Sequence, residues 1–287
     1  MSLHYHLKGT MGRNKDGSFA TQRARSATLL QCADQLKERG FRFEQPSQFK
    51  QKHINYLVER WKSENLSAGT IKNRLTHLRW LADKIGKPTI VLSNDQLNVE
   101  KRQFATQQDK SIVLDSKRLD KISSERIKDA LRLQNHFGLR REEALKFKPE
   151  LACKSPDGIQ LQSSWCKGGR ERTVPIKTDE QRALLAELSI KYPTGSLIPA
   201  DSSYKDFVKK YENQVAASGL GKAHGLRHGY AQKRYEELTG FRCSVCGGKQ
   251  RKEMSSEEKL IDDRARLIIS NELGHGRVDV VAKYIGN

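Results

Sequence analysis

The chain has 287 residues, and its 53 lysines and arginines against 34 aspartates and glutamates give a formal net charge of +19 at neutral pH. This length suits two domains with cores of ordinary size. The sequence contains no run of about 18 apolar residues and begins without the apolar stretch of a secretory signal, which argues against a membrane-spanning or secreted protein. We therefore expect a cytoplasmic protein. Five scattered cysteines argue against a disulfide framework.

The basic excess is spread over the whole chain. Residues 1–110 carry 20 basic and 10 acidic residues, and residues 111–287 carry 33 and 24. This pattern is typical of two domains that bind opposite sides of one polyanion. Charge alone does not separate DNA from RNA or from a membrane surface.

The first part of the chain predicts a small helical domain. Residues 1–18 are polar and rich in glycine, which predicts a flexible arm. Residues 19–97 predict an all-α unit, because apolar residues recur there at helical spacing. The expected helices cover 21–39, 47–63 and 67–86, with a short fourth helix after Ser93. Residues 98–113 are polar and predict an extended linker.

The helix expected at 67–86 has a basic face. A solvated outer face is the commoner meaning of such charges. The positive excess of the chain favours phosphate contacts, and we expect them from Lys72, Arg74 and Arg79.

Residues 114–287 predict a second domain that mixes helices with two strands. Strands are expected at 158–165 and 172–176, joined by a turn at Gly168 and Gly169. An insertion is expected at about 240–257. Helices are expected at 124–138, 142–147, 178–190, 202–217, 225–238, 256–273 and 277–286. The fold class is thus mainly α with a small β-sheet, or α+β.

Two segments of this domain carry candidate residues near the strands. Arg140 follows a Gly-Leu bend in FGLRREEAL, and Glu143 lies one helical turn further on, where it can orient the arginine. A surface salt bridge would explain this pair equally well. Lys167 is expected at the hairpin tip in CKGGRERTVPI, where an ammonium can protonate a leaving oxygen. A solvent-facing loop lysine is the alternative, but Arg170 and Arg172 favour a loop that contacts phosphate.

Two further segments complete the set. HGLRH places His224 and Arg227 on one face at the start of a helix, where a planar guanidinium fits two phosphate oxygens. A metal pair or a capped surface helix is the alternative. In ELGHGRVDVVAKYIGN, His275 occupies a turn and Tyr284 follows nine residues later. We expect the short helix that carries Tyr284 to be mobile until DNA and a partner subunit position it, since its apolar anchors are few: Val278, Val281 and Ile285.

The order and spacing of these residues resemble the tyrosine recombinase (phage integrase) family. The matching elements are the H-x-x-R-H box, the lysine turn, the L-G-H element and the nine-residue step to the tyrosine. The resemblance covers roughly residues 120–287. It implies a helical core-binding domain and a mixed catalytic domain that form a clamp around DNA. It assigns the catalytic positions to Arg140, Lys167, His224, Arg227, His275 and Tyr284.

The resemblance also implies a mechanism. Tyr284 attacks the scissile phosphate, forms a 3′-phosphotyrosyl link and releases a 5′-hydroxyl. Arg140 and Arg227 neutralise the growing charge, Lys167 protonates the leaving oxygen, His224 accepts the tyrosine proton, and His275 bonds the phosphate. No cofactor is expected. The implied partners are double-stranded DNA attachment sites and accessory DNA-bending proteins. The resemblance also implies that the protein is a monomer when free and a homotetramer on DNA.

One feature departs from the family pattern. Cys243 and Cys246, in the expected insertion, have the spacing of a zinc pair, but a structural zinc needs about four ligands. We therefore favour reduced thiols over zinc.

The expected function is integration or excision of a phage or mobile element. The alternatives are a DNA-relaxing enzyme of the type IB topoisomerase kind and a catalytically idle DNA-binding regulator of the same fold.

Overall fold

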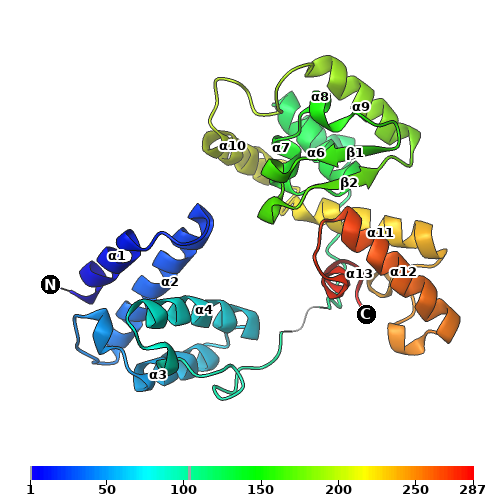
Figure 1. Cartoon of the computed structure of the whole chain (residues 1–287). Helices are drawn as coiled ribbons and strands as arrows, with labels where there is room; N and C mark the ends of the chain where they lie inside the picture. Colours follow the sequence, from blue (N-terminus) through cyan, green and yellow to red (C-terminus); the bar gives the residue numbers. More distant parts are fainter. Residues whose placement is uncertain (1, 103–104) are drawn as a thin grey trace. The chain divides into compact units, whose positions relative to one another are not determined.

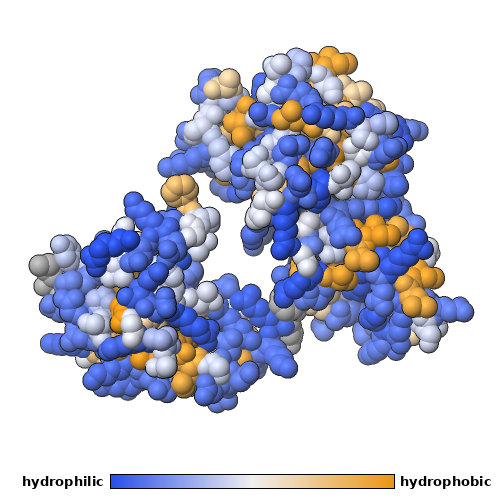
Figure 2. All heavy atoms as spheres, in the orientation of Figure 1, coloured by the Kyte–Doolittle hydropathy of each residue, from blue (hydrophilic) through white to orange (hydrophobic). Residues whose placement is uncertain are grey.

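The computed structural model describes residues 2–102 and 105–287. The chain divides into two compact units, Met1–Arg102 and Gln103–Asn287. Positions 103 and 104 of the expected linker, and position 1 of the expected arm, lie outside the described residues. Hydrophilic residues cover most of the face seen in Figure 2 on both units, with scattered apolar patches.

The first unit is helical throughout (Figure 1). Its α-helices are α1 (Leu3–Arg13), α2 (Phe19–Glu38), α3 (Gln51–Ser63) and α4 (Ala68–Lys84), with short 3-10 helices η1 (Pro46–Gln48) and η2 (Pro88–Ile90). The core is built from the apolar faces of these helices, centred on the fully buried Trp61, whose indole donates to Gln35 Oε1 at 2.9 Å. The α2, α3 and α4 helices agree with the helices expected from periodicity.

Two expectations for this unit are wrong. Residues 3–13 form a helix and not a flexible arm, because Leu3 and Leu7 lie one turn apart and are buried in the core. The glycines that suggested flexibility are outweighed by this pair. The short helix expected after Ser93 is a series of turns over residues 94–98, where Asn98 has a left-handed φ of 47°.

The second unit contains a two-stranded sheet and a central helix, α11, against which other helices of the unit pack. Its elements are α5 (Ser116–Asp120), α6 (Glu125–Phe137), α7 (Arg141–Leu145), α8 (Pro149–Ala152), β1 (Gly158–Leu161), η3 (Ser163–Trp165), η4 (Lys167–Gly169), β2 (Arg172–Pro175), α9 (Asp179–Lys191), α10 (Tyr204–Ala217), α11 (His224–Thr239), η5 (Ser244–Cys246), η6 (Arg251–Glu253), α12 (Ser256–Glu272), η7 (Val278–Val281) and α13 (Ala282–Ile285). The α+β fold class is confirmed. The expected clamp concerns the placement of the two units and stays a prediction.

The sheet is shorter than expected. β1 and β2 pair antiparallel from Gly158 opposite Pro175 to Leu161 opposite Arg172. Beyond Leu161 the chain leaves the ladder and forms η3 and η4, because Trp165 turns inward and is 5% exposed. The hairpin therefore ends in a broad loop that carries Lys167.

Helix α11 packs against α6, α12 and α13, and so organises the second unit (Figure 1). The end of α6 approaches it closely at Gly138, which has a left-handed φ of 60°. A Cβ at this position would lie 2.5 Å from the ring of Tyr230, so glycine is required both for the turn and for the approach. This turn delivers Arg140, two residues later, to the start of α11.

Candidate active site

Arg227 is the centre of the candidate site. Its side chain is 1% exposed, and it donates hydrogen bonds to the carbonyl oxygens of Gly138 and Leu273. Its Nε also donates to the hydroxyl of Tyr284 at 3.3 Å. Burial lowers the pKa of Arg227 to about 10, so the group is still a cation at neutral pH. One buried charge thus joins the α6–α7 turn, the end of α12 and the tyrosine.

Tyr284 is docked and not loosely held. It lies on α13, and its side chain is 5% exposed. Val281 and Ile285 are fully buried beside it, while Val278 is half-buried. The Tyr284 carbonyl oxygen accepts from Gln232 Nε2 at 3.2 Å, and Ser244 Oγ donates to the Ile285 carbonyl at 3.2 Å. The structure therefore docks this helix with polar contacts in addition to its few apolar anchors, and its mobility without DNA stays a prediction.

Three histidine rings surround the phenol ring of Tyr284. Their centroids lie 4.7 Å away for His228, 5.5 Å for His275 and 6.0 Å for His224. Burial lowers the pKa of His228 to about 4 and that of His275 to about 3, with the charges of Arg227 and Arg140 adding to the effect at His275. The pKa of His224 is also lowered, by its partial desolvation and then by Arg227 and Arg140. Two of these rings, His228 and His275, are therefore neutral at neutral pH.

The contact between Arg227 and His275 fixes a tautomer. Arg227 Nη2 lies 3.4 Å from His275 Nε2, and a guanidinium can only donate. His275 Nε2 is therefore the acceptor, and the ring proton is on Nδ1. That proton is available to a hydrogen-bond acceptor, and the bond to phosphate that the resemblance implies for His275 stays a prediction.

Arg140 is held by a buried carboxylate. Glu143 is fully buried, and its two oxygens accept from the backbone N–H and Nη1 of Arg140, each at 2.7 Å. Arg172 makes a second, bidentate pair with the same carboxylate at 2.9 and 2.7 Å. Burial alone would raise the pKa of Glu143, but the hydrogen bonds and charge of Arg172, with Arg140 and Arg227, lower it to about 2. The orienting role predicted for Glu143 fits this geometry.

Replacing Glu143 by Gln should destabilise the fold in a pH-dependent way. The folded pKa of about 2 lies below the ordinary 4.5, so the carboxylate's contribution is complete above pH 4.5 and is lost as pH falls toward 2. We expect Glu143→Gln to lower the free energy of unfolding at pH 7 by about 3 kcal/mol. Urea titrations at pH 7 and at about pH 3 measure the free energy of unfolding at each pH, and the difference between variant and wild type should be smaller at about pH 3. The exposed Glu171→Gln is the control, and a variant as stable as wild type at pH 7 would contradict the buried ion pair.

Lys167 and Arg170 lie on the exposed loop between the strands. Lys167 lines one cavity together with Arg140 and His224, in keeping with its predicted place at the phosphate. The guanidinium of Arg170 lies against Gly276, where a Cβ would be 1.9 Å from Nη1. The structure thus places Lys167 at the cavity of Arg140 and His224, and Arg170 beside the residue that follows His275.

Three of the cations predicted to bind DNA have other partners. The side chain of Arg172 is 7% exposed and is bonded to Glu143, so its charge is directed at this buried carboxylate. In the first unit, Arg79 donates to the Leu92 carbonyl and to Asn94 Oδ1. Arg74 stacks on Trp61 with its guanidinium carbon 5.1 Å from the ring. Each is a partly buried arginine that stabilises its own unit, a role that helical periodicity does not reveal.

The cysteine pair lies next to the tyrosine helix. Cys243 is buried and Cys246 half-buried around η5, which contacts α13. Both are free thiols, and burial followed by the neighbouring Cys246 raises the pKa of Cys243 to about 12. Within residues 2–102 and 105–287, no group of three or more His, Cys, Asp or Glu side chains is placed to hold a metal ion.

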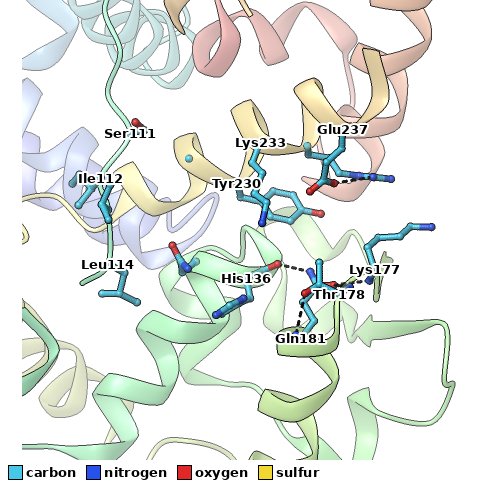
Figure 3. A pocket seen from close by; sticks show the side chains of 14 residues that line it. Ser111, Ile112, Leu114, His136, Lys177, Thr178, Gln181, Tyr230, Lys233 and Glu237 are labelled. Atoms are coloured by element: carbon cyan, nitrogen blue, oxygen red, sulfur yellow. Dashed lines mark hydrogen bonds and ion pairs between the residues drawn. The ribbon is translucent and has the colours of Figure 1, made fainter. Parts of the chain in front are cut away.

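The neighbouring tyrosines on α11 are engaged elsewhere. Tyr230 lines the pocket in Figure 3, which is bounded by residues 111–114 and the start of α9 and contains none of the six predicted catalytic residues. Its hydroxyl donates to Glu272 at 2.8 Å, and Tyr235 donates to Asp262 at 2.7 Å. Burial and these carboxylates raise the pKa of both hydroxyls. Neither is therefore suited to act as a nucleophile.

Sequence reasoning missed three residues of this site. His228 has the ring nearest to Tyr284, and its buried Nδ1 has no hydrogen-bond partner among the described residues. Gln232 bonds the tyrosine backbone, and Asp109 bonds Gln232 at 2.8 Å. His228 and Gln232 follow His224 at four and eight positions on α11, a spacing that in hindsight places all three on one face of the helix. Asp109 carries no sequence signal, because its role depends on how the linker folds back.

The fold is shared with DNA-bound recombinases of known structure. XerH site-specific recombinase in a post-cleavage complex with its difH substrate is 17% identical, with a TM-score of 0.60 over 98% of this chain and 80% of that one. A lambda integrase dimer on a core site is 14% identical, with a TM-score of 0.59 over 100% and 77%. The Tn1549 transposon integrase with circular intermediate DNA is 12% identical, with a TM-score of 0.55 over 100% and 96%. No curated protein matches the sequence.

Two family models match the sequence itself. The model for the N-terminal part of phage integrases matches residues 1–91, and the integrase model matches residues 101–233. Together they span most of the chain, although His275 and Tyr284 lie beyond the second match. The structure brings these two residues to Arg227, inside the matched region. The chain belongs to the tyrosine recombinase (phage integrase) family.

Proposed function

We propose that this protein is a site-specific recombinase that cuts and rejoins double-stranded DNA through a covalent bond to Tyr284. The observation that carries the proposal is the placement of the Tyr284 hydroxyl 3.3 Å from Arg227 Nε, with His224, His228 and His275 around the ring. A phosphate bound to Arg227 and Arg140 would lie within reach of this hydroxyl. All of these groups come from one chain.

The chemistry is a transesterification that conserves bonds. The Tyr284 oxygen attacks phosphorus and the bond to the 5′ oxygen breaks, which leaves a 3′-phosphotyrosyl link. Arg140 and Arg227 neutralise the charge that grows on the non-bridging oxygens. We assign the tyrosine proton to His224. The lowered pKa of this ring leaves it unprotonated at neutral pH, so it can accept a proton. Lys167 gives a proton to the leaving 5′ oxygen, and a 5′-hydroxyl reverses the step on another strand.

The two units divide the work. We propose that the first unit is the core DNA-binding domain, with Lys72 on α4 among its phosphate contacts, and that the second is the catalytic domain, with Arg170 on the loop near His275. Similar structures include a lambda integrase dimer on a core site and a lambda integrase tetramer on a Holliday junction. By analogy, the partner is a pair of attachment sites, and the working form is a homotetramer that assembles on DNA.

The described residues include no helix long and apolar enough to cross a membrane.

Plasmids that carry candidate attachment sites test the function. The expected result is exchange between two paired sites, with little relaxation of a supercoiled plasmid that lacks them. Products are read on gels and by sequencing across the junctions. Relaxation of any supercoiled plasmid without exchange would instead indicate a topoisomerase, and binding without cleavage would indicate a regulator.

A further inference from the structure

Residues 106–112 form a strap that crosses the tyrosine helix and α11. The strap begins at Thr106, whose N–H donates to the carbonyl of Ala282 on α13 at 3.1 Å. It ends at Ile112, whose N–H donates to the carbonyl of Gly225 on α11 at 3.3 Å. The strap is therefore bonded to both helices that build the site.

Two glycines let the strap lie close to the site. A Cβ at Gly225 would be 2.5 Å from the side chain of Ile112 and 2.8 Å from the carbonyl oxygen of Lys110. A Cβ at Gly286, which follows α13 with a φ of 78°, would be 3.3 Å from the Thr106 carbonyl oxygen. The strap is thus fitted to these helices at both of its ends.

Gln232 connects the strap to the nucleophile. Its side chain is 8% exposed, and its Nε2 donates to Asp109 Oδ1 at 2.8 Å and to the carbonyl oxygen of Tyr284 at 3.2 Å. A primary amide has two N–H donors, so both are used. One side chain therefore bridges the middle of the strap and the backbone of the tyrosine.

The acceptor on the strap is itself fixed. Asp109 Oδ1 also accepts from the backbone N–H of Ser111 at 2.8 Å, and Oδ2 accepts from Ser111 Oγ at 3.0 Å. This turn orients the carboxylate toward α11. The position of the strap consequently sets the position of the Gln232 amide. The amide in turn sets the position of the Tyr284 backbone through its hydrogen bond to the carbonyl oxygen.

We propose that Gln232 is a positioning residue that, through Asp109, ties the alignment of Tyr284 to the strap. The inference rests on the proposed function of Tyr284 as nucleophile. The Tyr284 hydroxyl is already at 3.3 Å from Arg227, so a small shift of α13 takes it out of reach. Attack on phosphorus tolerates such displacements poorly. Because the strap continues the chain that leaves the first unit, the segment that joins the two units also holds the nucleophile.

The test compares variants of the full-length protein on nicked DNA with candidate attachment sites. We expect Gln232→Leu and Asp109→Ala to lower the rate of adduct formation at saturating DNA by about 5- to 30-fold, the factor that corresponds to one or two lost hydrogen bonds. The dissociation constant for DNA should be unchanged, because neither residue contributes a cation. Asp109→Asn keeps an acceptor oxygen and should cleave at nearly the wild-type rate.

The double variant gives the sharpest comparison. If both residues act through one bridge, Asp109→Ala combined with Gln232→Leu cleaves about as slowly as Gln232→Leu alone. Multiplied losses in the double variant would contradict the bridge. Gln214→Leu is the matched control, since Gln214 bonds Ser123 and Ser124 elsewhere in the second unit.

A second readout does not depend on catalysis. Hydrogen exchange of the backbone amides over residues 282–286 should be faster in Gln232→Leu and in Asp109→Ala than in wild type, with α9 unchanged. Equal exchange rates would refute the inference. If the wild type forms the adduct and Gln232→Leu cleaves as fast as the wild type, the inference is also refuted. If the wild type forms no adduct, the proposed function is refuted, and the exchange rates alone decide whether the Gln232 contact holds the helix.

Discussion

Tyr284→Phe should abolish covalent attachment to DNA while leaving DNA binding intact. The substitution removes the hydroxyl and keeps the ring, which is 5% exposed and packed among three histidines. Among the described residues, the hydroxyl accepts a hydrogen bond from Arg227 Nε at 3.3 Å. Without the oxygen there is no nucleophile for phosphorus, so no adduct should be seen above background on denaturing gels.

Tyr230→Phe is the matched control for this substitution. Tyr230 is also buried in the second unit, and its hydroxyl donates to Glu272 at 2.8 Å. Its removal should reduce stability slightly and leave adduct formation in place. An adduct that survives in Tyr284→Phe and disappears in Tyr230→Phe would move the nucleophile to the neighbouring helix.

Arg227→Lys should lower the rate of cleavage at saturating DNA by about 10²- to 10³-fold, the usual cost of one lost donor to transition-state charge. Lysine keeps the positive charge but not the planar fork. The guanidinium of Arg227 contacts two carbonyl oxygens, the tyrosine hydroxyl and His275 together. A single ammonium cannot serve all four positions. The rate is measured as single-turnover adduct formation on nicked DNA.

Arg234→Lys separates this effect from a general loss of stability. Arg234 lies on the same helix, is also largely buried, and pairs with Glu272 and Glu237 away from Tyr284. Both variants should unfold at a lower temperature than wild type. Cleavage by Arg234→Lys should nevertheless stay within a few-fold of wild type, and a comparable loss in both variants would show that the Arg227 effect is structural.

Much of this fold follows from local patterns in the sequence. The helices α2, α3, α4 and α6 have apolar residues at regular helical spacing, and Gly138 ends α6 in the left-handed conformation expected of a terminal glycine. The catalytic candidates come from the order and spacing of motifs that resemble the family, and their roles stay predictions. The structure places Arg140, Lys167 and His224 around one cavity, and Arg227, His275 and Tyr284 in direct contact.

What the sequence does not reveal depends on contacts between distant segments. Arg172 is a surface candidate by its neighbours, yet it is buried on Glu143, 29 positions earlier in the chain. Asp109 and Gln232 are 123 positions apart and meet only because the strap folds back over α11. The docking of α13 was underestimated for the same reason, since its backbone partners come from the strap and from the loop around Ser244. Periodicity reports the face of a helix, not its partner.

The buried carboxylate links the arginines of this site. Glu143 neutralises part of the charge of Arg140 and Arg172, which would otherwise repel each other and Arg227. Arg140 keeps 21% of its side-chain area exposed, the part that the proposed function assigns to phosphate. The candidate site thus combines one buried arginine that contacts the tyrosine with one arginine whose side chain is partly exposed.

The most direct measurement is the chemical identity of the protein–DNA bond. Wild-type protein is trapped on nicked attachment-site DNA, the adduct is digested with nuclease and protease, and the modified peptide is sequenced by mass spectrometry. We expect a nucleotide linked through its 3′ phosphate to the tyrosine oxygen of Tyr284, with a free 5′-hydroxyl on the released strand. A nucleotide on any other residue, or a 5′-phosphotyrosyl bond, would contradict the account.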